Sequence, residues 1–428
     1  MRGDSQRLAQ LALSLTLLWV GSVVAQAADN ATAESGNQWQ KPDWLTASVR
    51  DALWSSNRQL DDQTLIHQPS IWLKAKGKIN QNFSGLVSAF KAYEGHAPAY
   101  AMQSRINEAY LTFKHEDTQI RLGRQIFSWG RADRINPSDF LGAKNLTQLV
   151  TDDEQQRLGV DAIKLTQSFE NLSVSLVHAF RFTPTRSLLP PDINQQAIDV
   201  QTERNSQEAL RVDWNHEGLD ASLTYFDGLE KNPYLALDPA RGTVVRTYSR
   251  IHALAADFAT SLNKVGLRGE VAMIRHRAPA LADAYFTRGS TLYSVLGVER
   301  EIPDWCNLNL QYIYRLERPR QSPANAPLPV LGELAFVQGL VDFAPDHVNH
   351  ALSLRLAKNF LNDRMQTELV LLHNLRRHDY AVRPRLVFDW TDNTKLSIGA
   401  DLFRGKADSV FGSIRNNSVF FVELGYTI

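Results

Sequence analysis

The carboxyl-terminal segment of the chain has an apolar side chain at every second position, alternating with Phe421, Glu423, Gly425 and Thr427. Its apolar positions are Phe420, Val422, Leu424, Tyr426 and Ile428. A period of two places successive side chains on opposite faces of a β-strand. One apolar face and one mixed face suit a wall that separates lipid from a polar lumen. The stripe therefore predicts the closing strand of a transmembrane β-barrel.

The amino terminus has the pattern of a secretory signal. Arg2 and Arg7 precede an apolar run over residues 8–24, and a small-residue site ends at Ala27. We predict a signal peptide over residues 1–27, with cleavage after Ala27. The alternative, a membrane-anchoring helix, is disfavoured because polar residues interrupt the run and it is short for a span of about 20 residues.

Beyond residue 27 no apolar stretch approaches the length of a transmembrane helix. Only helices and closed barrels satisfy every backbone donor and acceptor inside lipid. The fold class predicted is therefore all-β, a transmembrane antiparallel barrel. Residues 28–43 are polar without a period and predict a periplasmic lead-in, followed by the outer-membrane barrel over residues 44–428.

Alternating segments and connections of two kinds set the expected strand number. We count about 18 segments near the length of a tilted strand, about 9 to 11 residues, and an even number requires residues 48–55 as the first strand. The alternative is a short periplasmic helix over residues 44–60, which leaves 16 strands. Tight turns are expected at residues 80–82, 116–118, 168–171, 216–218, 262–264, 303–304 and 361–364. Long outer loops are expected at residues 130–156, 184–207, 227–246, 276–290 and 318–349.

Large aromatic residues gather toward the ends of the predicted strands, which is typical of a girdle at the membrane interface. They are Trp72, Phe83, Phe127, Trp129, Trp214, Trp305, Phe388, Trp390, Phe403 and Phe421. The core of a soluble sandwich gives a similar pattern.

Composition excludes several classes of function. The 46 basic and 46 acidic residues give no net charge and no electrostatic case for nucleic acid. The single cysteine, Cys306, excludes an intramolecular disulfide and a cysteine metal cluster. The histidines are dispersed without ligand spacing, so we expect neither a metal site nor a cofactor.

Charged residues that alternate with the apolar stripes are candidates for the lumen lining. A charge on the lipid face costs about 2 to 4 kcal/mol near the midplane. The basic candidates are Lys74, Lys76, Lys78, Arg121, Arg181, Arg211, Arg268, Arg315, Arg355, Arg383 and Arg385. The acidic candidates are Glu108, Asp213, Asp257, Glu270, Glu317, Asp389 and Asp401. They either set the field for a solute or form cross-strand ladders that support the barrel.

Three lysines stand out because their own strand carries no acid to neutralise them. They are Lys74, Lys76 and Lys78. They are the strongest local candidates for selectivity.

Residues 120–145 are the most distinctive segment, with the sequence IRLGRQIFSWGRADRINPSDFLGAKN. It predicts a strand followed by a long loop that carries Arg131, Asp133, Arg134 and Asp139. If this loop folds inward, these residues constrict the pore. The alternative is an outer loop held by arginine–aspartate pairs.

Several short motifs carry a resemblance to a known family. They are LGRQ, SWG and NPSD in residues 122–139, YFDG at Tyr225 to Gly228, ADFATS at Ala256 to Ser261, GLRGEVA at Gly266 to Ala272 and GADLF at Gly399 to Phe403. The chain resembles Gram-negative porin-like barrels and is similar to the alginate-export and uncharacterised outer-membrane porin families. The resemblance implies passage of a solute across the cell outer membrane. Such barrels usually end in Phe or Trp, whereas this chain ends in Ile428.

The sequence predicts a passive porin-like channel for small polar or anionic solutes, and not an enzyme. Its expected partners are outer-membrane lipid, the solute and the barrel-assembly machinery, which would recognise the carboxyl-terminal strand. Three alternatives remain open: an export channel for an anionic polysaccharide, a plugged receptor and a barrel enzyme. The enzyme has no local signature such as G-x-S-x-G.

Overall fold

The computed structural model describes residues 43–56, 64–94, 101–187, 198–199, 205–238, 242–277 and 288–428. The predicted signal peptide, and the lead-in up to residue 42, lie outside the described residues. One compact unit, Thr46–Thr427, contains the strands described below except for Leu45, the first residue of β1.

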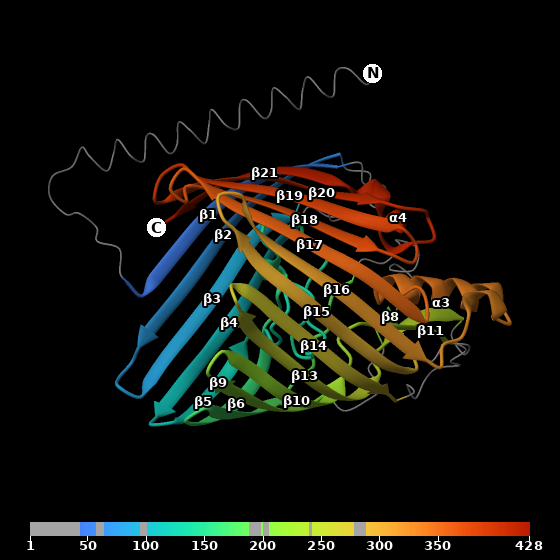
Figure 1. Cartoon of the computed structure of the whole chain (residues 1–428), viewed down its shortest axis with the longest axis horizontal. Helices are drawn as coiled ribbons and strands as arrows, with labels where there is room; N and C mark the ends of the chain where they lie inside the picture. Colours follow the sequence, from blue (N-terminus) through green and yellow to red (C-terminus); the bar gives the residue numbers. More distant parts are fainter. Residues whose placement is uncertain are drawn as a thin grey trace, which may run out of the picture. The chain divides into compact units, whose positions relative to one another are not determined.

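Eighteen strands form one closed antiparallel barrel (Figure 1). They are β1 (Leu45–Ser56), β2 (Leu65–Lys78), β3 (Phe83–Glu94), β4 (Ala101–His115), β5 (Thr118–Gln125), β6 (Val160–Phe169), β7 (Leu172–Ala179), β9 (Gln207–His216), β10 (Leu219–Leu229), β13 (Arg250–Leu262), β14 (Val265–His276), β15 (Ser290–Ile302), β16 (Cys306–Arg318), β17 (Val348–Phe360), β18 (Met365–Asn374), β19 (Asp379–Asp389), β20 (Thr394–Arg404) and β21 (Val419–Thr427). The first strand pairs with the last from Ser48 opposite Thr427 to Ser56 opposite Val419. The prediction of 18 strands is confirmed, and the helix considered for residues 44–60 is wrong.

The strand faces follow the alternation in the sequence. On β16, Leu310 and Tyr312 are exposed on the outer surface, whereas Asn309 and Gln311 point inward and are buried. Exposed aliphatic side chains also mark the outer surface of other strands, for example Leu223 on β10. Within the described residues, no helix has the length and apolar character needed to cross a membrane.

The two rims of the barrel differ. At the tight-turn rim every connection has four residues or fewer, at residues 79–82, 116–117, 170–171, 217–218, 263–264, 303–305, 361–364 and 390–393. Residues with positive φ, such as Asn263 and Lys264, make these reversals. The long-loop rim carries most of the remaining connections, including residues 126–159 and 319–347.

Two of the predicted loops contain regular structure that the sequence analysis missed. The connection after β10 holds β11 (Tyr234–Asp238) and β12 (Thr243–Thr247), and β12 pairs with β8 (Ile198–Asp199). The connection after β16 holds α3 (Pro329–Val341), with proline in its first turn. Side chains of α3 pack against β11 and β12, and Gln338 accepts a hydrogen bond from Leu235 N at 2.8 Å. These elements form a cap at the long-loop rim (Figure 1).

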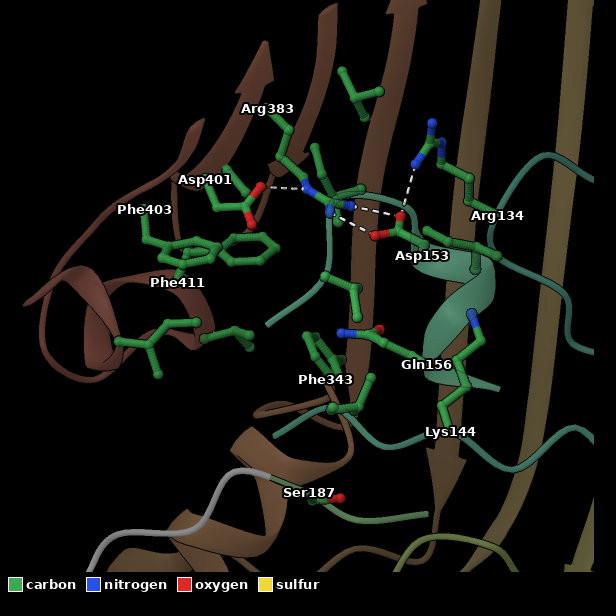
Figure 2. A pocket seen from close by; sticks show the side chains of 18 of the residues that line it. Arg134, Lys144, Asp153, Gln156, Ser187, Phe343, Arg383, Asp401, Phe403 and Phe411 are labelled. Carbon is green, nitrogen blue, oxygen red and sulfur yellow. Dashed lines mark hydrogen bonds and ion pairs between the residues drawn. The ribbon is translucent and has the colours of Figure 1, made fainter. Parts of the chain in front are cut away.

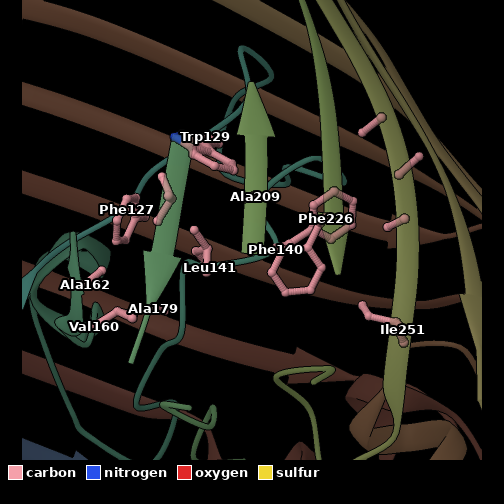
Figure 3. Packing of buried hydrophobic residues seen from close by; sticks show 14 residues of the cluster. Phe127, Trp129, Phe140, Leu141, Val160, Ala162, Ala179, Ala209, Phe226 and Ile251 are labelled. Carbon is pink, nitrogen blue, oxygen red and sulfur yellow. The ribbon is translucent and has the colours of Figure 1, made fainter. Parts of the chain in front are cut away.

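The segment between β5 and β6, residues 126–159, folds into the barrel. Its Phe127, Trp129 and Phe140 are buried against small inward residues of the wall, among them Ala179 and Ala209 (Figure 3). Small wall residues leave room for the aromatic rings, and burying a large apolar side chain contributes about 1.5 to 3 kcal/mol. The expectation that Phe127 and Trp129 belong to an interfacial girdle is therefore wrong. It is also wrong for Phe403 and Phe421, which face the lumen.

Candidate functional site

The inward segment, residues 126–159, is clamped to the β14 wall by one carboxylate. Glu270 accepts hydrogen bonds from Arg131 N at 2.7 Å, Ala132 N at 2.6 Å, Asn136 Nδ2 at 2.9 Å, and Ser138 N and Oγ at 3.2 and 2.8 Å. Its side chain is buried. A buried carboxylate requires such a set of donors because desolvation of an unpaired charge is costly. This is the first of two clamps that hold the segment across the lumen.

Beside Glu270, the guanidinium group of Arg131 pairs with Asp257 of β13 and lies 3.5 Å from Asp213 of β9. Asp257 also accepts hydrogen bonds from Arg211 at 3.0 Å and Ser222 at 2.5 Å. The charged wall residues of this sector, Arg211, Asp213 and Asp257, therefore pair with the inward segment or with one another.

The second clamp is a chain of alternating charges between the segment and strands β17 to β20. Its members in order are Asp133, Arg355, Glu368, Arg134, Asp153, Arg383, Asp401 and Arg385. Figure 2 shows Arg383 between Asp401 and Asp153, with Arg134 on the other side of Asp153. Each charge faces at least one opposite charge, so the chain has little residual field for a solute.

The Asp153 carboxylate is the centre of this chain. Burial alone raises the pKa of a carboxyl group, but the hydrogen bonds from Arg383 and the charge of Arg134 outweigh burial. The pKa of Asp153 is therefore held well below its ordinary range.

The segment also reaches the remaining wall. Thr151 Oγ1 donates to Glu423 of β21 at 2.9 Å, and Arg105 of β4 donates to the Gln155 carbonyl at 3.3 Å. Leu149 packs against a buried cluster that includes Trp54 and Phe421. The segment thus touches strands on every side of the lumen and narrows it.

A cavity of about 840 Å³ lies between the segment, the end of α3 and the wall of β17 to β21 (Figure 2). Phe343, Phe403 and Phe411 give it an apolar side, and Lys144 contributes an ammonium group. Burial, followed by the nearby charges of Arg157 and Lys231, lowers the pKa of Lys144. Lys144 makes no ion pair with another described residue.

Polar groups near Lys144 also lack partners. Gln148 and Ser187 are among the residues that line the same cavity, and their side-chain oxygens are buried without a hydrogen-bond partner within the described part of the chain. Unsatisfied buried polar groups are costly unless a ligand or water meets them. The cavity therefore offers an ammonium group without an ion pair to a described residue, and an apolar wall, to a solute.

The wall of β2 to β6 differs from the clamped walls because five of its inward cations form no ion pair with a described residue. Lys74, Lys76 and Lys78 are exposed and form no ion pair with a described residue. On β5 and β6, Arg121 lies directly opposite Lys164 in the register, and the Arg121 guanidinium stacks on the Tyr110 ring at 4.4 Å. Sequence analysis missed Lys164, although it alternates with the outward Leu165.

The other predicted lining residues fall into three groups. Arg268 pairs with Glu299 at 2.8 Å, and Asp389 pairs with Lys395 at 3.2 Å. Arg315 and Glu317 are used by the cap, where they bond to the Asp342 carbonyl and to Arg320. Glu108 of β4 accepts from Ile126 N at 3.4 Å, at the start of the inward segment.

Arg181 does not belong to the strand wall, because β7 ends at Ala179. Asp139 of the predicted constriction is buried and pairs with Arg157 at 3.1 Å inside the segment. Arg131, Asp133 and Arg134 lie in the lumen and are paired as described above.

Comparison with known proteins finds similarity in structure. No protein-family model matches the chain, and no curated protein matches it in sequence. OccD3 (OpdP) of Pseudomonas aeruginosa is similar with a TM-score of 0.53 and 11% identity, over 90% of both chains. OccAB1 of Acinetobacter baumannii has a TM-score of 0.56 and 10% identity, over 90% of this chain and 95% of that one.

The chain has the fold of an outer-membrane porin. OpdK of Pseudomonas aeruginosa, solved with vanillate, adds a TM-score of 0.55 at 8% identity, over 90% of this chain and 98% of that chain. The porin-like resemblance inferred from the sequence motifs is confirmed at the level of fold.

Proposed function

We propose that the protein is a passive outer-membrane channel for small anionic solutes. One observation carries the proposal: the lumen charges of the clamps neutralise one another, whereas those of the β2 to β6 wall do not. Lys74, Lys76 and Lys78, with Arg121 and Lys164, leave that side of the lumen positive. A lining of one charge sign raises the local concentration of oppositely charged solutes.

The cavity beside the inward segment supports a more specific class of solute. Lys144 supplies a cation for a carboxylate, and Phe343, Phe403 and Phe411 supply an apolar surface for the rest of the molecule. A structural neighbour, OpdK, was solved with vanillate. We therefore infer that small carboxylates with an apolar body pass more readily than equally large neutral sugars.

Lys144→Met tests the role of the cavity. It removes the ammonium group and keeps an unbranched chain of similar length. In liposomes that contain the purified barrel, we expect vanillate uptake to fall about tenfold, because one charge-assisted hydrogen bond contributes about 1.5 to 3 kcal/mol. Uptake of a neutral pentose is the control and should not change. Equal vanillate uptake by both proteins would contradict the role of Lys144.

The polysaccharide-export alternative fits the lumen less well. A polymer requires an unobstructed passage, and residues 126–159 touch strands on every side of the barrel. We also infer that the protein is a channel rather than an enzyme.

Three further expectations from the sequence belong to the same proposal. The protein belongs to a Gram-negative cell, and the signal at residues 1–27 directs its export to the periplasm. The barrel-assembly machinery recognises β21. The tight-turn rim faces the periplasm and the long-loop rim faces outside, as is usual for such barrels.

A further inference from the structure

The outer surface of the barrel near the long-loop rim carries charged side chains, which are balanced in the sector of β5 to β13. On strands β5 to β13 basic groups face acids across neighbouring strands. These pairs are Arg124–Asp161, His178–Glu208 and Arg250–Asp227, with N–O distances of 2.8, 2.7 and 2.6 Å. Such pairs leave little net field for a partner outside the barrel.

The sector of β18 to β20 is different, because its outward basic groups face no acid across the strands. His373 lies opposite Tyr380 in the register, and Tyr380 lies opposite Arg404. The His378 ring lies 6.3 Å from the His373 ring. Tyr380, His378 and Arg404 are exposed, and none of His373, His378 and Arg404 forms an ion pair with a described residue.

Arg376, in the turn between β18 and β19, adds a second guanidinium group. It lies 3.4 Å from the Asp346 carboxylate, which Arg377 already holds more closely, at 2.7 Å. The Arg376 side chain remains 44% exposed. Arg376 is therefore available to a second anion.

The next outward row toward the tight-turn rim is wholly aliphatic. It is formed by Leu354, Leu371, Val382 and Leu402, which are opposite one another in the register. A polar, basic row directly above an aliphatic row matches a molecule with an anionic head and hydrocarbon tails. An aromatic residue such as Tyr380 is favoured at that boundary.

We propose that this surface, the β18–β20 patch, binds the phosphate headgroup of a lipid in the surrounding leaflet. The patch consists of His373, Arg376, His378, Tyr380 and Arg404. Arginine forms charge-assisted hydrogen bonds with phosphate oxygens, and the aliphatic row receives the acyl chains. The site lies on the outer surface and is separate from the lumen, so lipid binding is independent of solute passage.

The test compares two double variants of the full barrel, purified in a neutral detergent. Arg376→Gln/Arg404→Gln removes the two guanidinium groups of the patch. Lys91→Gln/Arg275→Gln is the matched control, because both residues are exposed, outward and basic but belong to other strands. Unit conductance in planar bilayers verifies that each variant is folded. The probe is dioleoyl phosphatidic acid, titrated by native mass spectrometry.

We expect the patch variant to bind this lipid about 25-fold more weakly, because each surface cation contributes about 1 kcal/mol, or about fivefold, to binding of an anionic lipid. The control should keep the affinity of the unmodified protein. An unchanged affinity in the patch variant, or an equal loss in the control, would overturn the proposal. Competition by inorganic phosphate as strong as that by the lipid would also overturn it, since the acyl chains would then contribute nothing.

Discussion

Replacement of Glu270 by alanine tests whether the first clamp holds the inward segment in place. Glu270 accepts five hydrogen bonds, from Arg131, Ala132, Asn136 and twice from Ser138. Each hydrogen bond to a charged acceptor contributes about 1.5 to 3 kcal/mol to the stability of the docked segment. After the substitution, hydrogen bonds from the freed donors to water recover part of that total. Loss of one partner of a buried charge network costs about 3 to 5 kcal/mol. We therefore expect a loss of about 4 kcal/mol, which changes the ratio of docked to undocked segment about 10³-fold.

Single-channel recording measures this ratio directly. In the unmodified barrel the docked segment should give one steady open level. Glu270→Ala should give larger, fluctuating steps, because the segment leaves the β14 wall while the second clamp still holds its other side. Asp389→Asn is the control, since Asp389 is a lumen carboxylate that pairs with Lys395 and does not touch the segment. A folded Glu270→Ala barrel with the steady conductance of the unmodified protein would refute the clamp.

Three further predictions concern selectivity, topology and pH. The triple change of Lys74, Lys76 and Lys78 to Gln should shift the reversal potential toward cations without unfolding the barrel, and an unchanged potential would remove these lysines from the selectivity argument. Cysteine placed within residues 322–326 should react with an impermeant maleimide on whole cells, whereas protection in a folded barrel would reverse the orientation. The pKa of Asp153 is depressed in the folded barrel. Its ion pairs therefore contribute fully to the stability of the barrel above the ordinary carboxyl pKa of about 3.9. This contribution is lost as the pH falls through the lower, folded-state pKa. The contribution of Asp153 to the conductance should therefore be the same at pH 7 and pH 5. A change in that interval that the unmodified barrel shows and the Asp153→Asn variant lacks would contradict this sign.

The strand number and the strand faces were predictable from the sequence because period-two alternation is a local property. Residues 305–317 show this well, since Asn307, Gln311 and Glu317 face inward as their alternation with Leu310 and Tyr312 predicts. Apolar side chains face the lipid and polar side chains face the lumen. The alternation within one short segment is therefore enough to predict which side chains of a strand point inward.

The inward fold of residues 126–159 was not decided by the sequence, because its partners are distant in the chain. Glu270 is 132 or more residues away from the donors it accepts, and Arg383 is 230 residues from Asp153. The same charges suit a paired outer loop equally well. The run that forms α3 likewise lies within the outer loop expected at residues 318–349, and its packing partners on β11 and β12 are distant in the chain.

Single-channel conductance of the refolded protein in planar bilayers, with the reversal potential under a salt gradient, tests the central claim most directly. The account predicts discrete steps with a preference for anions, because the unpaired cations of the β2 to β6 wall line an open part of the lumen. A properly folded barrel that conducts nothing, or that prefers cations, would contradict it.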